Sequence, residues 1–334
     1  MGHANRPRTA TARFRQGRLA ELLAAHFGVV SIFVVFSLLF AFFSVQTTAF
    51  LTADNLVNVG RQIAPTIVVG TLMTFVITTG AIDLSVGSVV GLSAALIGLL
   101  AKSGDPLVAF LVPIGIGAAI GFANGWLTAY GKLQSFIVTL AALTAVRGVA
   151  LLLTQGYSTP IEVDWILAIG QAQFLGVFLA TWIAVGVAIA GWYVLSQTRY
   201  GRYIVAVGSN AESLRRSGVD IRRVQLIAFV ATSMIAAFAG IMVAARLASG
   251  SSNSGTGFEL EVITAVVLGG TSLLGGRGSI VGTVLGAMTL GIIANGLVLL
   301  RFDVYWVPII QGVILVVAIF LNSKLFGRLL GSFR

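Results

Sequence analysis

The sequence predicts an all-α polytopic membrane protein with about ten transmembrane helices, some of them broken or re-entrant. Of its 334 residues, 57% are hydrophobic and only 10% are charged, whereas a soluble domain averages about 25% charged residues. Apolar stretches close to the roughly 20 residues that cross a bilayer recur along most of the chain. This composition does not fit a soluble globular enzyme.

Ten apolar segments are candidate spans on that length criterion. They are residues 27–45, 62–80, 84–101, 107–129, 135–154, 173–195, 224–248, 259–275, 279–300 and 304–322. Together they form one transmembrane domain, residues 27–322, between a basic segment, 1–26, and a tail, 323–334. The segments 62–80 and 84–101 have almost no connecting loop between them, and neither do 259–275 and 279–300. These two short connections, at residues 80–85 and 275–279, are predicted to be helix breaks.

The orientation follows from the positions of Lys and Arg, which are enriched in cytoplasmic loops. With the N-terminus inside, most of them fall on the cytoplasmic side, in residues 1–26, in the loop 196–223 and in the tail. Both termini are therefore predicted to be cytoplasmic, and the first span is predicted to remain uncleaved. The net charge of +10 is explained by these loops, so we do not expect nucleic-acid binding.

Intramembrane polar residues are the main functional signal, because placing a charge in hydrocarbon is costly. Residues 78–91 read TTGAIDLSVGSVVG and place Asp83 among helix-breaking glycines. Arg147 lies within the apolar run 135–154 and needs a carboxylate partner or a polar interior; Asp83 is one possible partner. For Asn124, Asn295 and Gln311, interhelical hydrogen bonding is an alternative to lining a pore. The candidates for the translocation path or its gate are Asp83, Ser85, Asn124, Arg147, Asn295 and Gln311.

The loop 196–223 is the one long polar insertion between spans. Ser209 and Glu212 have the spacing of a capping box, and Gly218 suits the position after a helix end. A short helix over about 210–217 is therefore predicted at the cytoplasmic face, with Asp220 capping the next span. Its position at the middle of the chain favours docking of a partner over a plain connector. The residues assigned to it are Ser209, Asn210, Glu212, Arg215, Arg216 and Gly218.

Catalytic and metal-binding motifs are absent from the sequence. It contains no cysteine and two histidines, both near the N-terminus, so no metal site is predicted. The nearest approach to a P-loop, Gly125 to Gly131-Lys132, has the wrong spacing and is followed by Leu133. The chain is therefore not expected to be an enzyme or to bind a cofactor, and any ATP would be used by a separate subunit.

Five stretches resemble the permease subunits of ribose/xylose-type ABC importers, from about residue 55 to 320. They are GAIDLSVGSVVGLSA (80–94), NGWL (124–127), SFIVTLAALTAVRGVALLLTQG (135–156), YGRYIVAVGSNAESLRRSGVDI (200–221) and TAVVLGGTSLLGGRGSIVGTVLGA (264–287). The resemblance implies a multi-pass protein of the bacterial inner membrane that carries a monosaccharide. It also implies three kinds of partner: a second permease copy, usually identical; an ABC ATPase that docks on the helix within 196–223; and a periplasmic or extracellular sugar-binding protein.

The intramembrane acid also fits two other classes of function. An ion-coupled secondary transporter of a small polar solute would use Asp83 as a proton or sodium site. An intramembrane enzyme would need clustered histidines, paired acids or a Ser/Lys dyad, which the sequence does not show.

Overall fold

The structure is a computed structural model that describes residues 29–101, 104–303 and 305–317. Within these ranges it is a helical bundle whose sheets have two strands each. The basic segment 1–26, the tail 323–334 and the ends of the first and last predicted spans lie outside the described residues. The all-α class is confirmed for the part of the chain that the structure describes.

Seven described helices are long and apolar enough to cross a membrane. They are Val29–Gln46, α2 (Ala53–Thr78), α4 (Pro106–Ala129), α5 (Ser135–Thr154), α7 (Leu179–Gln197), α9 (Ile221–Leu247) and α11 (Ile280–Leu299). Three segments predicted as spans form shorter helices: α3 (Val86–Leu100), α10 (Phe258–Leu268) and Trp306–Val317. Each of the ten predicted spans therefore corresponds to a helix, but three of these helices are shorter than a full span over the described residues.

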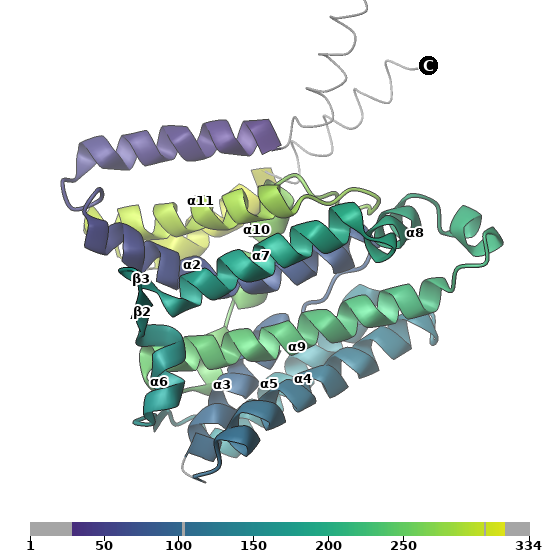
Figure 1. The fold of residues 1–334 in the computed structure, drawn as a ribbon, viewed down its shortest axis with the longest axis horizontal. Helices are drawn as coiled ribbons and strands as arrows, with labels where there is room; N and C mark the ends of the chain where they lie inside the picture. The colour runs from purple at the N-terminus through teal and green to yellow at the C-terminus, as the bar shows by residue number, and fades with distance from the viewer. Residues whose placement is uncertain (1–28, 102–103, 304, 318–334) are drawn as a thin grey trace, which may run out of the picture.

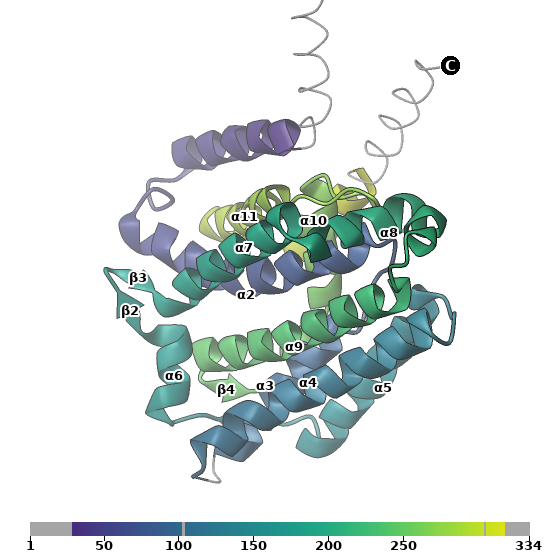
Figure 2. The same ribbon diagram turned by 45° about the vertical axis from the view of Figure 1, so that its right-hand side comes forward.

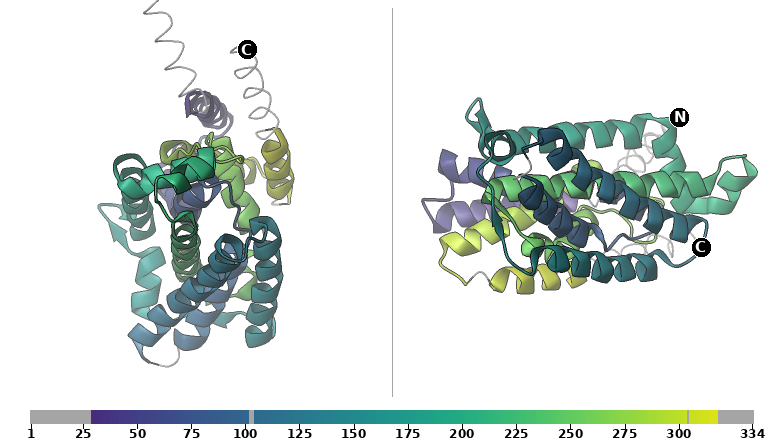
Figure 3. Two further views of the ribbon diagram at one scale, coloured as in Figure 1. Left: turned by 90° about the vertical axis from the view of Figure 1, so that its right-hand side faces the viewer. Right: turned by 90° about the horizontal axis from the view of Figure 1, so that it is seen from below.

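The helices of the bundle form two layers that share α9 (Figures 1 and 2). One layer contains α2, α7 and α11, and the other contains α3, α4 and α5. Helix α9 packs against α2, α3 and α4, and the end-on view shows it between the layers (Figure 3). The short α6 (Asp164–Gln171) and the helix α8 (Arg199–Arg216) lie at opposite ends of the bundle (Figure 1). The predicted cytoplasmic loop 196–223 contains α8, so it lies at the opposite end of the bundle from α6.

Two pairs of very short strands are found near α6. Strand β1 (Thr159–Pro160) pairs antiparallel with β4 (Ser249–Gly250), with Thr159 opposite Gly250. Strand β2 (Gln173–Phe174) pairs antiparallel with β3 (Val177–Phe178), with Gln173 opposite Phe178. The first pair connects residues almost a hundred positions apart, so it joins the loop before α6 to the segment after α9.

Three predicted helix boundaries are wrong. Helix α7 begins at Leu179 rather than at residue 173, because residues 173–178 form the strands β2 and β3 and the turn between them. Helix α2 begins at Ala53 rather than at residue 62, because its first turns carry the polar residues Asp54 and Asn55 that a hydropathy criterion rejects. Helix α10 ends at Leu268 rather than at residue 275. Gly270 follows with a φ of +88°, a left-handed conformation that glycine adopts without strain and that cannot continue a helix.

Glycines allow several helices to approach closely. A Cβ atom at Gly117 or Gly121 of α4 would lie 2.7 Å from a backbone oxygen of α9. The α3 glycines face non-helical backbone instead: a Cβ at Gly91 would lie 2.5 Å from the carbonyl oxygen of Ser252, in the 3-10 turn η2 (Ser252–Gly255). Small residues thus replace the hydrophobic drive for association that lipid does not supply.

Candidate functional site

Asp83 is fully buried in the loop between α2 and α3 and is held by hydroxyl and amide donors. Its Oδ1 accepts hydrogen bonds from the backbone N–H of Ser85 (2.9 Å) and from the Ser85 hydroxyl (2.6 Å). Its Oδ2 lies 3.5 Å from Oγ of Ser233 on α9. The Ser85 hydroxyl in turn accepts from Nδ2 of Asn124 on α4 at 2.9 Å. Three of the predicted path residues, Asp83, Ser85 and Asn124, therefore form one buried network.

The same loop is fixed to the start of α5. The Ile82 N–H donates to Oγ of Ser135 (3.1 Å), and the Ile82 carbonyl accepts from Oγ1 of Thr139 (3.2 Å). The break between α2 and α3 thus has contacts with α4, α5 and α9. A buried non-helical segment needs such partners, because its free N–H and C=O groups cannot reach water.

Arg147 does not pair with Asp83. Its Nη2 donates to the carbonyl of Gly255 at 3.3 Å and lies 3.7 Å from Oε2 of Glu259, near the start of α10. The Glu259 side chain is 10% exposed and that of Arg147 is 27% exposed. The pair therefore joins α5 to the junction between η2 and α10, and the Asp83–Arg147 contact considered from the sequence is not formed.

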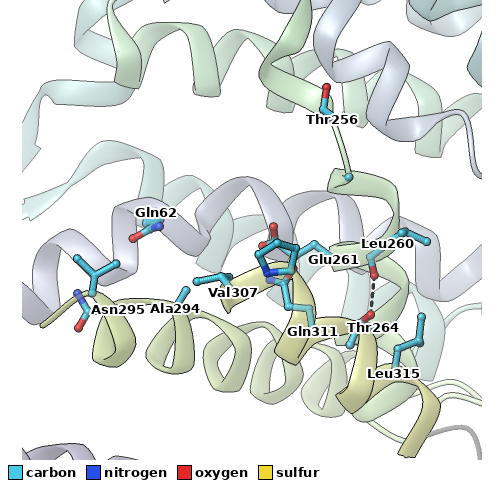
Figure 4. A pocket seen from close by; sticks show the side chains of 14 residues that line it. Gln62, Thr256, Leu260, Glu261, Thr264, Ala294, Asn295, Val307, Gln311 and Leu315 are labelled. Atoms are coloured by element: carbon cyan, nitrogen blue, oxygen red, sulfur yellow. Dashed lines mark hydrogen bonds between the residues drawn. The ribbon is translucent and has the colours of Figure 1, made fainter. Parts of the chain in front are cut away.

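A cavity of ≈ 610 Å³ lies between α2, α10, α11 and the helix Trp306–Val317 (Figure 4). Its size is within the range of small-molecule sites. Two of the predicted path residues, Asn295 and Gln311, line it. The other lining residues are Gln62, Thr256, Gly257, Leu260, Glu261, Thr264, Ala294, Val298, Val307, Pro308, Gly312 and Leu315.

Asn295 both lines this cavity and forms an interhelical hydrogen bond. Its side-chain amide exchanges two hydrogen bonds with that of Asn55 on α2, at 3.0 and 2.8 Å. Both roles considered for Asn295 are therefore compatible with its position. Gln62 and Glu261 also line the cavity but are not among the predicted path residues, because both lie at the edge of a predicted span, where polar residues are common.

Helix α8 contains a kink at Asn210, whose φ of −158° and ψ of 85° are non-helical. The Asn210 Oδ1 accepts from the backbone N–H of Ser213 at 2.9 Å, so Asn210 is the N-cap of the short segment 211–216. The predicted capping box is wrong. Ser209 belongs to the preceding helix, where its hydroxyl donates to the Val205 carbonyl at 2.8 Å. Asparagine and serine cap equally well, so the sequence alone did not separate these neighbours.

The end of this segment matches the prediction. Glu212 accepts hydrogen bonds from Arg215 at 3.0 Å and from Arg216 at 3.1 Å, and these bonds hold the pKa of its carboxyl below the ordinary value. Gly218 has a φ of +81°, as expected for the residue after a helix end. Asp220 caps α9 by accepting from the N–H of Arg222 at 3.1 Å.

The part of α8 before the kink packs against the two non-helical connections, the one after α2 and the one after α10. The Gly276 N–H donates to the carbonyl of Thr78 at 2.8 Å, which connects the segment after α10 to the end of α2. Gly208 packs on this junction so closely that a Cβ there would overlap the Thr78 oxygen and the Gly276 nitrogen. We call Thr78, Gly208 and Gly276 the glycine joint. It places the kinked end of α8 in direct contact with the two non-helical connections of the bundle.

Comparison with known proteins identifies the family. A family model described as "Branched-chain amino acid transport system / permease component" matches residues 55–319. The ribose import permease protein of Escherichia coli K12 is 39% identical over 293 residues, which cover 86% of this chain and 91% of that protein. No solved structure matches the chain.

Two further relatives are named for other cargoes. The autoinducer 2 import system permease protein of Klebsiella pneumoniae is 37% identical over 305 residues, which cover 91% of this chain and 86% of that protein. The xylose transport system permease protein of Haemophilus influenzae is 30% identical over 368 residues, which cover 91% and 98%. The chain belongs to the family of multi-pass inner-membrane permeases of ABC importers, of the ribose/xylose type.

Proposed function

We propose that this chain is the transmembrane subunit through which a monosaccharide, delivered by a binding protein, crosses the membrane at the expense of ATP hydrolysed on a separate subunit. Similarity to permeases named for ribose and xylose supports a monosaccharide cargo. Similarity to a permease named for autoinducer 2 makes other small polar cargoes the alternatives to test. The relatives are transport subunits, so no catalytic role is proposed for this chain.

The observation that carries the coupling part of the proposal is the geometry of α8. Its segment 211–217 lies at one end of the bundle and is capped and charged, and its exposed side chains are free to meet an ATPase. The helix before it touches both breaks through the glycine joint. Movement of the segment would therefore displace the end of α2 and the connection after α10 together.

The path itself is proposed to include the cavity lined by Asn295 and Gln311. A second copy of the chain is proposed to complete the path. The buried network of Asp83, Ser85 and Asn124 is proposed to hold the α2–α3 break in place. It lies outside the residues that line the cavity, so a gating role is proposed for it in preference to a binding role.

Reconstitution tests the proposal. The permease, its ATPase and its binding protein are placed in liposomes, and uptake of labelled ribose and xylose is measured with ATP inside or outside. We expect uptake to require ATP on the ATPase side and loaded binding protein on the other. Replacing Glu212 and Arg215 by alanine is expected to abolish stimulation of ATPase activity by the binding protein. Uptake driven by an ion gradient without ATP would refute the proposal, and unchanged stimulation in the double variant would refute the docking site.

A further inference from the structure

We propose that Glu261 is a sugar-binding residue of the translocation path, whose carboxylate accepts hydrogen bonds from hydroxyl groups of the cargo. This inference rests on the proposed function and adds a specific ligand group to it. Glu261 lies in the first turn of α10 and lines the ≈ 610 Å³ cavity (Figure 4). Its Oε1 accepts from Oγ1 of Thr66 on α2 at 2.8 Å, which fixes the carboxylate at the cavity wall.

The carboxylate of Glu261 retains capacity for a ligand. A carboxylate has about four acceptor positions, and among the described residues Thr66 is the one side chain that donates to Glu261. No Lys or Arg in the described ranges forms a salt bridge with it. Glu259, two residues earlier, differs because Arg147 lies 3.7 Å from its Oε2. Of the two acids of α10, Glu261 is therefore the one that can bind a ligand without first losing a partner.

The charges around Glu261 favour a neutral ligand over a cation. Arg246 is close enough to attract the carboxylate electrostatically, and Arg61 is close enough to repel Arg246. Both guanidinium groups have partners of their own, since Arg246 donates to the Gln62 carbonyl at 3.3 Å and Arg61 lies 4.2 Å from the centre of the Phe178 ring. The positive charge of Arg246 beside the single negative charge of Glu261 would oppose the entry of a metal ion or an ammonium group.

The remaining lining groups suit a polyhydroxylated solute. The side-chain amides of Gln62, Gln311 and Asn295 can both donate and accept, and sugar hydroxyls do the same. Apolar groups such as Val307 and Leu315 provide surface for the C–H faces of a sugar ring. The ligand class assigned to the site is therefore a neutral sugar or polyol.

The test is a comparison of uptake by the reconstituted complex with Glu261→Gln and with the wild-type chain. The probes are ribose and a set of monodeoxy ribose analogues. Losing a hydrogen bond to a charged group is expected to reduce ribose uptake by about tenfold, because such bonds contribute about 1.5 kcal/mol or more. For the analogue that lacks the contacted hydroxyl, the two proteins are expected to differ by less than about twofold. Glu261→Asp, which keeps the charge and shortens the side chain, is expected to give an intermediate loss.

The matched control is Glu162→Gln, which neutralises an exposed carboxylate outside the cavity. This variant is expected to take up ribose and each deoxy analogue at the same rates as the wild type. The inference is overturned if Glu261→Gln transports ribose like the wild type, or if its uptake of ribose and of every analogue falls by the same factor. It is also overturned if neither Glu261 variant assembles, which would give the residue a structural role, or if wild-type uptake at fixed ATP depends on sodium. In each case ATP-dependent uptake by the wild-type complex still tests the proposed function separately.

Discussion

Replacing Gly208 by alanine is expected to destabilise the protein and to uncouple ATP hydrolysis from transport. The added Cβ would overlap the carbonyl oxygen of Thr78 and the amide nitrogen of Gly276. These are backbone atoms, which cannot rotate away as the end of a side chain can. They are also joined by a 2.8 Å hydrogen bond, so relief of the clash must lengthen that bond or move α8 away from the joint.

The size of the effect is the difference between two terms. Forcing an extra carbon into a packed site costs about 1–3 kcal/mol, whereas alanine in place of glycine within a helix is worth up to about 1 kcal/mol. The net loss therefore lies between about 0 and 3 kcal/mol, with the middle of the range at about 1.5 kcal/mol. A loss of this size leaves the protein folded but shifts the packing equilibrium at the joint by about tenfold.

The assay has two readouts on the same purified complex. Thermal unfolding in detergent is expected to show a lower midpoint for Gly208→Ala. Binding-protein-stimulated ATPase activity is expected to persist while uptake per ATP falls. Gly186→Ala on α7 is the matched control, because a Cβ at Gly186 would meet nothing within 4 Å, and it is expected to leave both readouts unchanged or slightly raise the midpoint. A Gly208→Ala complex as stable and as well coupled as the control would refute the role of the joint.

Three further outcomes are expected. Asp83→Ala should lower the unfolding midpoint more than Asp83→Asn, because alanine leaves the donors of Ser85 unsatisfied at about 1–3 kcal/mol each; transport lost without any change in stability would instead assign the carboxylate to substrate or gating. Asn55→Leu and Asn295→Leu should each destabilise the protein, and the double variant should lose less than the sum of the two, since a single change removes the hydrogen bonds between the two amides and leaves a polar group of the other side chain without that partner; additive losses in thermal unfolding would contradict this pairing. The Glu212 carboxyl should titrate below the ordinary glutamate pKa of about 4.3, so its stabilising contribution is present above that pH and is lost as the pH falls through the lowered pKa; an ordinary pKa in a carbon-13 carboxyl titration would exclude the Arg215 and Arg216 contacts.

Much of the helix pattern followed from hydropathy and local signals. The boundaries of α5 are those predicted, and α4 differs by one residue, because Asp105 and Pro106 mark its start by an N-cap and a proline in the first turn. The first part of α8 was not predicted, because residues 199–209 are too few to cross a bilayer and include Arg199 and Arg202. Their helix packs on the bundle through the buried side chains of Ile204 and Val207. Hydropathy detects the environment of a helix, so it fails where a helix lies outside the membrane.

The sites were predictable as residues but not as contacts. Asp83, Arg147 and Asn295 were identifiable because polar side chains in apolar segments are costly. Their partners lie far away in the sequence: Arg147 meets Glu259 and Asn295 meets Asn55. One sequence contains no local pattern that specifies such pairs, since they depend on how the helices cross.

The glycine face of α3 has a consequence for how the protein is made. Helix α3 has 15 residues, which span about 22 Å, less than the roughly 30 Å of the hydrocarbon core. Its glycines fit residues 250–255, where a Cβ at Gly98 would lie 2.8 Å from Cα of Gly250. That segment is synthesised more than a hundred residues later, roughly 10 to 30 s at bacterial translation rates. During this interval α3 lacks its partner, so we expect the nascent chain to depend on the insertion machinery until its second half emerges.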